Sequence, residues 1–175
     1  MNVSSKNTRK FDNLSNKLQD VNLMKLSLNQ KIVLWIDHLG NFSAPDRVYI
    51  YFFEKDVNDY IIANNTHEWC GKKIHSMKDE QKNIPIDLFP YFKKVLYENK
   101  EIARINSIND LTDDAQSMIE LMSFQGLKSI LAVPIIKEAN TIGFIGYETI
   151  KKEKIWNNED LKALKIVACL ITVKH

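Results

Sequence analysis

Histidine and cysteine side chains come together once in the sequence, around His67, Cys70 and His75. A structural zinc site usually needs four such ligands at defined spacing, and this segment offers one His-x-x-Cys pair with a single further histidine. The two remaining histidines, His38 and His175, lie far away along the chain. We therefore expect no metal site.

Paired carboxylates can act as general acid and general base, and Asp113, Asp114 and Glu120 are the nearest candidates. Neighbouring residues at the start of a helix point in different directions, so Asp113 and Asp114 would not share a site. Acidic side chains at that position complement the helix dipole instead. The chain also has no Gly-rich phosphate loop, no Gly-x-Ser-x-Gly elbow and no His-Glu-x-x-His helix. We expect no catalytic activity.

Aromatic and methionine side chains provide the best candidate for a ligand-binding site, because ligand cavities are mostly apolar and carry a few polar groups. The expected apolar wall consists of Trp69, Phe89, Tyr91, Phe92, Met118, Met122 and Tyr147. The expected polar groups are Arg104, Ser123 and Ser129. The alternative interpretation is that these residues fill an ordinary core, for which methionine is a good gap filler.

Strands must hold part of this set. The run over 48–53 is β-branched or aromatic throughout and too short for a helix, which predicts a strand buried on both faces. After a polar turn, residues 60–70 return as a second, more mixed strand, so the two form a hairpin. A short strand is expected over 102–105.

A second hairpin is predicted nearer the C-terminus. Apolar runs over 129–136 and 141–147 flank a polar tetrad, which is typical of two strands joined by a tight turn. Pro134 has no backbone N–H to donate, so its strand should carry a bulge or lie at an edge there.

Helices are expected between and after these strands. Apolar residues recur at helical spacing over 88–96, from Met118 to Met122, and over 161–171. Asn157 can cap the last of these helices. Hairpins combined with helices imply an α+β fold, with a mainly antiparallel sheet and helices on both faces.

The N-terminal region predicts one long helix, with no Gly or Pro before Gly40, which is placed as a C-cap glycine. Its apolar residues form a heptad seam, interrupted at Lys25, through Phe11, Leu14, Leu18, Val21, Leu28, Ile32, Trp35 and Leu39. Two interpretations are open, a dimeric coiled coil and an amphipathic helix that covers the sheet of its own domain. The candidate dimer contacts are Leu14, Leu18, Val21 and Leu28.

Composition excludes several classes of protein. The chain has 24 basic and 22 acidic residues, well mixed, and this near balance argues against nucleic acid as a partner. No apolar run approaches the roughly 20 residues that span a bilayer, and the polar N-terminus is unlike a signal peptide. Two distant cysteines make no disulfide framework, so we expect a cytoplasmic protein.

Several short motifs occur together in a characteristic order. They are Asp46-Arg47-Val48-Tyr49-Ile50, His67-Glu68-Trp69-Cys70, Asn83-Ile84-Pro85, Phe89-Pro90-Tyr91-Phe92, Gln125-Gly126-Leu127-Lys128-Ser129, Val133-Pro134-Ile135, Ile142-Gly143-Phe144-Ile145-Gly146 and Trp156-Asn157. With these motifs, the segment 28–173 resembles the GAF domains of sensor histidine kinases, cyclases and related signalling proteins.

The resemblance implies a GAF-like, PAS-related fold with a central antiparallel sheet of five or six strands. The terminal helices would cover one face, and the middle helices and loops would cover a ligand cavity on the other. Residues 1–27 would be a helical extension, and residues 28–175 the sensory domain. In such proteins the terminal helices join a parallel dimer bundle that passes a conformational bias to a kinase or another output domain.

The resemblance also bears on cofactors. Some GAF relatives attach bilins or reduce methionine sulfoxide through cysteines, but the patterns for those activities are absent around Cys70. The cyclic-nucleotide signature is not matched over 106–114. We therefore expect no cofactor, which leaves an unidentified small molecule as the ligand.

The predicted function is that of a non-catalytic sensory input domain of a signal-transduction protein, most closely a histidine kinase. Its expected partners are a second copy of the chain and the output domain. Two alternatives remain, a dimerisation module that binds no ligand and a small reductase that uses the thiol of Cys70.

Overall fold

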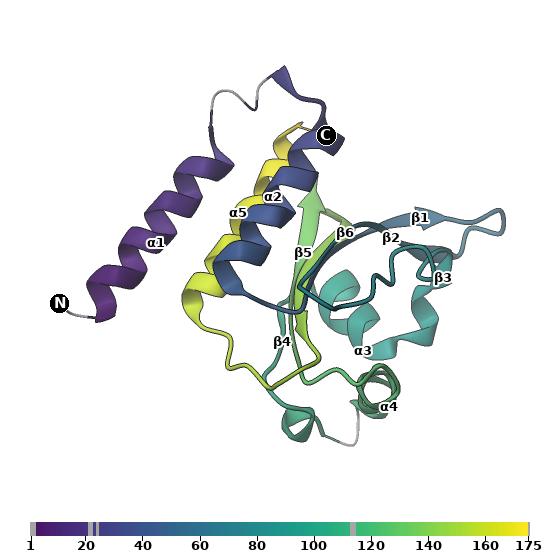
Figure 1. The fold of residues 1–175 in the computed structure, drawn as a ribbon. Helices are drawn as coiled ribbons and strands as arrows, with labels where there is room; N and C mark the ends of the chain where they lie inside the picture. The colour runs from purple at the N-terminus through teal and green to yellow at the C-terminus, as the bar shows by residue number, and fades with distance from the viewer. Residues whose placement is uncertain (1–2, 21–22, 24, 113–114, 175) are drawn as a thin grey trace.

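A six-stranded antiparallel sheet lies at the centre of the fold, with helices on both of its faces (Figure 1). The computed structural model describes residues 3–20, 23, 25–112 and 115–174. The strands are β1 (Arg47–Lys55), β2 (Ile61–Cys70), β3 (Ile84–Pro85), β4 (Ala103–Ile105), β5 (Ser129–Lys137) and β6 (Asn140–Thr149), in the spatial order β3-β2-β1-β6-β5-β4. The predicted α+β class and antiparallel sheet are confirmed.

The helices separate into two groups. One face of the sheet is covered by α2 (Leu28–Ser43) and α5 (Asn158–Lys174), and α1 (Val3–Leu18) packs on the outside of these two helices (Figure 1). The middle of the chain contributes shorter pieces: η2 (Ile86–Leu88), α3 (Pro90–Phe92), the π-helix η3 (Lys93–Glu98), η4 (Ile108–Asp110) and α4 (Gln116–Gln125). The single helix predicted over 88–96 is thus a succession of short helical segments.

The N-terminal region forms two helices, and the prediction of one continuous heptad helix is wrong. The chain turns back after α1, and α2 begins at a capping box in which Gln30 N donates to Ser27 Oγ (3.3 Å) and Ser27 N donates to Gln30 Oε1 (2.9 Å). This reciprocal cap satisfies backbone donors that a continuous helix would use internally, so it marks a true helix start. Val21 lies outside the described residues.

The first helix packs against its own chain. Leu14 and Leu18 retain 4% and 1% of their accessible surface and belong to the core that α2 and α5 form with the sheet. Trp35 Nε1 donates to the backbone oxygen of Leu18 (3.1 Å), which ties the end of α1 to α2. Lys10 Nζ donates to the backbone oxygen of Phe42 (2.6 Å) at the other end of the pair. Two predicted dimer contacts are therefore buried within one chain, while Leu28 is half-buried.

Gly40 is not the end of α2. The helix continues to Ser43, and Ala44 caps it in a left-handed conformation with φ of 49°. Gly40 instead faces the indole of Trp69, and a Cβ there would lie 2.4 Å from the ring. The residue is glycine because the strand's tryptophan occupies the space of a side chain.

The C-terminal hairpin and final cap follow the predictions. β4 pairs with β5 only at residues 130–132, so Pro134 lies where that edge is open, and the ladder shifts register between Ile135 and Ile136. Asn157 caps α5, its Oδ1 accepting from Asp160 N (3.0 Å).

β1 is buried on both faces over 48–50, as predicted, and is half-buried over 51–53. Val48 and Ile50 point into the core beneath the terminal helices. Tyr49 points into a second core beneath α4 and the segment around α3, with Tyr51 and Phe53 packed beside it. This alternation decides which side chains reach each face.

Candidate functional site

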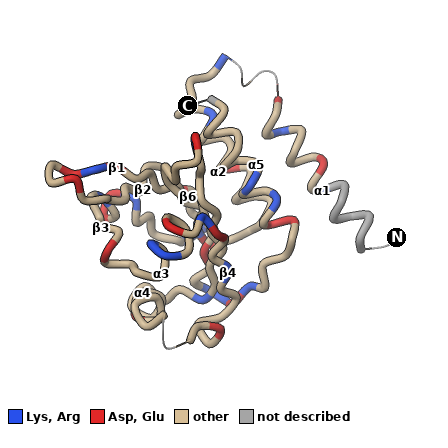
Figure 2. Tube along the Cα trace, turned by 180° about the vertical axis from the view of Figure 1, so that it is seen from behind, with Lys and Arg blue, Asp and Glu red and all other residues tan. Residues whose placement is uncertain are grey.

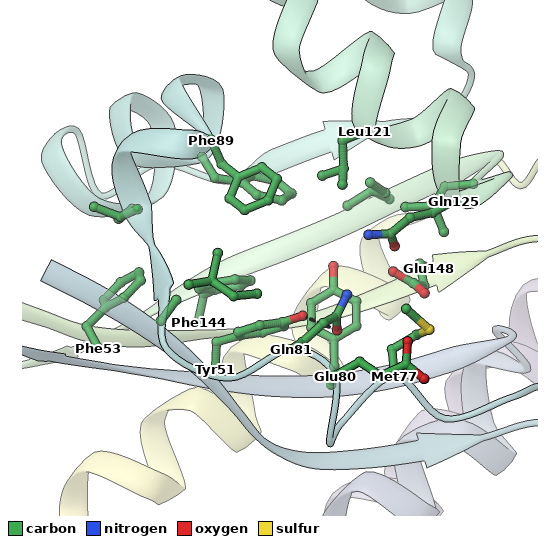
Figure 3. A pocket seen from close by; sticks show the side chains of 17 residues that line it. Tyr51, Phe53, Met77, Glu80, Gln81, Phe89, Leu121, Gln125, Phe144 and Glu148 are labelled. Atoms are coloured by element: carbon green, nitrogen blue, oxygen red, sulfur yellow. Dashed lines mark hydrogen bonds between the residues drawn. The ribbon is translucent and has the colours of Figure 1, made fainter.

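A partly open cavity of about 260 Å³ lies on the face of the sheet away from α2 and α5, bordered by the α3 region, α4 and the segment before β3 (Figure 3). Its walls are largely apolar. The aromatic lining residues are Tyr49, Tyr51, Phe53, Phe89, Phe92 and Phe144. A concave, mostly apolar space is typical of small-molecule sites, although this one lies below the roughly 300–1,000 Å³ of most drug-sized pockets.

Alternation along β1 and β6 builds the floor of this cavity. Tyr51 and Phe144, adjacent on the paired strands, stack with ring centroids 4.7 Å apart and planes 4° from parallel. Phe92 reaches the same floor from α3, with its centroid 5.7 Å from that of Phe144. The rings pack on one another at different angles, with Phe92 tilted by 41° to Phe144, and form an aromatic cluster at the floor of the cavity.

A register shift in β2 brings two polar residues onto the cavity face. Asn65 pairs with Tyr51 and Glu68 pairs with Tyr49, with the irregularity between Ile50 and Tyr51. Asn65 Nδ2 then donates both to Glu68 Oε1 and to Gln81 Oε1, each at 3.2 Å. The Tyr51 hydroxyl donates to the same oxygen of Gln81. The bulge thus fixes the segment that closes one side of the cavity.

Glu68 secures the beginning of that segment. Its Oε2 accepts from Met77 N (2.8 Å) and from the hydroxyl of Ser76. Met77, Glu80 and Gln81 then line the cavity. This segment, which forms one wall of the cavity, is held in place by hydrogen bonds to side chains of β2.

Glu148 is the buried acidic group of the site. Its Oε1 is ion-paired with Arg47 Nη1, and Arg47 Nε donates to the backbone oxygen of His75 (3.0 Å). Burial raises the pKa of Glu148 to about 7, although the charge of Arg47 lowers it. Glu68 and Asp46 raise the pKa further by repulsion. The carboxyl group can therefore change its charge near neutral pH.

The structure brings two of the predicted wall residues into the cavity lining, Phe89 and Phe92. Tyr91 is half-buried beside Phe92, with ring centroids 6.0 Å apart, and does not line the cavity. Met118 and Met122 are buried in the second core without reaching the cavity. These two methionines therefore fill the core, as the alternative interpretation of the aromatic and methionine set expects.

Trp69 and Tyr147 lie on the other face of the sheet. Tyr147 stacks on Trp156 with centroids 5.5 Å apart, in the core beneath α5. Trp69 Nε1 donates to Asp37 Oδ1 of α2 (3.2 Å). Trp69 is next to Glu68 in the sequence, and Tyr147 is next to Glu148, and both glutamates face the cavity side. Successive side chains of a strand point to opposite faces, so an error of one residue places a side chain on the wrong face.

The three polar residues predicted for the site also lie elsewhere. Arg104 and Ser123 are exposed and do not line the cavity. Ser129 is buried, but its hydroxyl donates to the backbone oxygen of Asn106 (2.6 Å) and accepts from Lys154 N (2.7 Å). It braces two loops.

The polar groups that do line the cavity were missed from sequence: Glu80, Gln81, Gln125 and Glu148. For Glu148 a signal existed. It shares strand parity with Phe144 and directly opposes Arg47, so alternation would have placed it on the cavity face. Gln81 had no such signal, because it lies in an irregular segment.

Other chemistry has little support in the described part of the chain. No group of three or more metal-binding side chains occurs among the described residues. Burial and the charge of Glu68 raise the pKa of Cys70 to about 11, so its thiol is a poor nucleophile at neutral pH. Basic and acidic residues are interspersed over helices, strands and loops (Figure 2). No described helix is both long enough and apolar enough to cross a bilayer.

Comparison of the sequence with known proteins gives one informative relative. No model of a known protein family matches the chain. The methanogenesis regulatory histidine kinase FilI of Methanothrix harundinacea (strain 6Ac) is 27% identical over 151 residues. The match covers 83% of this chain but 16% of the kinase, so the chain spans less than a fifth of that relative.

Solved structures share the whole architecture. The GAF3 domain of Slr1393 from Synechocystis sp. PCC6803, in its photoproduct state, has a TM-score of 0.66 at 18% identity and covers 84% of this chain and 92% of its own. A phycocyanobilin-bound GAF domain from a cyanobacterial phytochrome has a TM-score of 0.71 at 16% identity and covers 95% and 92%. This chain has the GAF fold. The resemblance drawn from the sequence motifs is confirmed.

The expectation that no cofactor is involved is contradicted by these GAF-fold structures. The cyanobacterial domain holds phycocyanobilin. A further structure, in a far-red absorbing dark state with bound biliverdin IXa, has a TM-score of 0.73 at 14% identity and covers 94% of this chain and 96% of its own. The expectation rested on the absence of known cysteine and cyclic-nucleotide patterns, whereas domains of this fold hold a bilin in these proteins.

Proposed function

We propose that this GAF domain is a sensory input domain of a signalling protein of the histidine-kinase type and binds a small molecule in the aromatic cavity. The observation that carries the proposal is the largely apolar, partly open cavity of about 260 Å³ with its cluster of aromatic rings. The match to a regulatory histidine kinase supports the assignment to signalling. An output domain such as a kinase would be its partner.

Bilins are the ligand class that the structural neighbours bring to this proposal. The aromatic side chains of the lining would contact the rings of such a ligand. A linear tetrapyrrole is larger than a typical drug-sized ligand, however, and the cavity lies below the drug-sized range. Among the described residues, no cysteine lines the cavity for a thioether link, and no basic side chain lines it for the propionate groups of a bilin. The described residues therefore fit a smaller ligand better than they fit a bilin.

The relay would run through β2, whose neighbouring residues face opposite sides of the sheet. Glu68 holds the wall of the cavity through Met77 N, and Trp69 packs on Gly40 and bonds to Asp37 of α2. A ligand that moved the wall would therefore act on α2 through one strand end. It can bias the helices only by its difference in affinity between the two arrangements.

Self-association through the terminal helices is part of the proposal, with different contacts from those expected. Leu14 and Leu18 are buried in their own chain, whereas Val33 and Leu34 of α2 are 51% and 36% exposed. These two side chains are the better candidates for contact with a second copy. The division of the chain into a helical extension over 1–27 and a sensory domain over 28–175 is also a proposal, as is a cytoplasmic location.

The domain is proposed to have no catalytic activity of its own. The alternative of a thiol-dependent reductase needs a cysteine that ionises easily. Cys70 has the opposite property, since burial and Glu68 raise its pKa to about 11.

The test is a fragment screen of the chain by protein-observed NMR, in which backbone amide shifts are mapped for each compound. We expect the hits to shift amides around Phe92, Phe144 and Gln81. The matched control is Ala63→Phe, which adds a ring at a buried lining position and should abolish the hits. Val57→Phe, at a position that is 99% exposed, should leave them unchanged. A screen without cavity hits would favour a module that binds no ligand.

A further inference from the structure

We propose that the cavity of this domain selects an organic ammonium ion, a compound with an apolar body and a positively charged amine that contacts Glu148. The inference rests on the proposed function, because it names the class of ligand for the same cavity. Three independent features of the lining support it: the sign of its charges, the free acceptor on Glu148 and the aromatic floor.

The charged lining residues carry one sign. Two of the 17 residues that line the cavity, Glu80 and Glu148, are acidic, and none is lysine, arginine or histidine. Figure 3 shows both carboxylates at the same end of the cavity as the amides of Gln81 and Gln125. The opposite end is aromatic, with Phe53 and Phe89 (Figure 3). A ligand that matches this gradient has a cationic or N–H-rich end and an apolar end.

The carboxylate of Glu148 keeps acceptor capacity for a ligand. An ionised carboxylate has two oxygens and about four acceptor positions. Among the described residues, Arg47 makes the hydrogen bond to this carboxylate, and it uses Oε1. Arg47 does not line the cavity, and its Nε is engaged with the backbone oxygen of His75. An ammonium group in the cavity can therefore bond to Oε2 without displacing the existing ion pair.

The aromatic floor adds a second attraction for a cation. The faces of aromatic rings are negative and attract ammonium groups within about 6 Å of the ring centroid. Tyr49 and Tyr51 lie edge to face with centroids 5.6 Å apart, and Tyr51 stacks on Phe144. These rings line the same cavity as Glu148. An anionic ligand would meet both the rings and the carboxylates unfavourably.

The test compares three indole compounds of similar size and different charge: tryptamine, 3-ethylindole and indole-3-propionate. Each is titrated into the wild-type chain by protein-observed NMR at a pH above 7, where Glu148 is ionised. Because a hydrogen bond to a charged group discriminates by at least about tenfold, tryptamine should bind at least about ten times more tightly than indole-3-propionate. The shifted amides should include those near Glu148 and Gln81.

Variants locate the selectivity. Glu148→Gln should weaken tryptamine binding by about tenfold and leave 3-ethylindole unchanged. If this variant fails to fold because Arg47 loses its partner, Glu80→Gln tests the same end of the cavity from a more exposed position. Glu101→Gln, exposed and outside the lining, is the matched control and should change nothing.

The outcomes separate the inference from the proposed function. Equal or tighter binding of 3-ethylindole or indole-3-propionate would overturn the selectivity for cations and leave the ligand cavity intact. Binding of none of the three would overturn the inference, and a fragment screen without cavity hits would then overturn the proposed function as well.

Discussion

Glu148 should make the stability of this domain depend on pH in a direction opposite to that of most carboxylates. In the folded chain its pKa is about 7, compared with an ordinary value of 4.5, mainly because the group is buried. The folded state therefore holds this proton more tightly than the unfolded state does. The resulting stability is fully present below the unfolded pKa and is lost as the pH rises from about 4.5 to about 7.

The size of the effect follows from the shift. One pKa unit corresponds to about 1.4 kcal/mol, so a change from 4.5 to about 7 is worth at most about 3 kcal/mol. The side chain of Glu148 is 9% exposed and that of Arg47 is 8% exposed, so solvent screens the pair little. The guanidinium of Arg47 stays charged throughout this pH range, so its own ionisation does not change the free energy of unfolding with pH.

The assay is urea unfolding of the wild-type chain and of Glu148→Gln across about pH 5 to pH 8. Glutamine is neutral at every pH, so the variant removes the titration of this group together with its ion pair to Arg47. The comparison therefore uses the change of the stability difference with pH, and not its absolute size. The free energy of unfolding of the wild type should fall relative to that of the variant by about 2 to 3 kcal/mol over this range. A difference that stays constant with pH would refute the argument, as would a wild type that gains stability relative to the variant.

Three further substitutions test the packing. Gly40→Ala should destabilise the chain by about 1 to 3 kcal/mol despite the better helix propensity of alanine, because the Cβ would lie 2.4 Å from the ring of Trp69. Thermal unfolding measures this loss of stability. The double variant with Trp69→Leu should regain most of it. Leu18→Ala should cost about 2 to 5 kcal/mol in urea unfolding, since Leu18 is 1% exposed within one chain; unchanged stability would argue that α1 belongs to a partner. Val33→Glu should shift the protein toward monomer in light scattering, and an unaltered oligomeric state would place the interface elsewhere.

The parts of the fold that follow from local patterns could be predicted. The continuous β-branched and aromatic run over 48–53 predicts a strand buried on both faces, and Val48 and Tyr49 indeed enter opposite cores. Asn157 predicts the start of α5 because an asparagine side chain can accept from the first free backbone N–H groups. Each of these signals lies within a few residues of the feature it specifies.

The break between α1 and α2 has a signal in the sequence, but the longer periodicity of apolar residues favours one continuous helix. The Ser27-x-x-Gln30 capping box marks the start of α2. The spacing of apolar residues from Phe11 to Leu39 suggested a single seam, because two antiparallel helices that pack on one core keep the same apolar periodicity. A periodic pattern alone does not distinguish one helix from two.

The candidate site was harder to predict, because strand parity and a bulge decide it. Tyr147 was expected in the cavity, but Glu148 faces it, one residue further along β6. The register shift that places Asn65 and Glu68 on the same face has no local sequence signal, and it positions the wall around Gln81. Such features arise from the pairing of distant segments.

The most direct test of the central claim measures whether a ligand on one face of the sheet alters the helices on the other. Amide hydrogen exchange of the chain would be followed with and without a saturating fragment from the cavity screen, with Ala63→Phe as the non-binding control. We predict changed protection in β2 near Trp69 and in α2 around Gly40, in addition to the cavity wall. Changes confined to α3, α4 and the segment before β3 would contradict the account, because the domain would then bind a ligand without relaying it.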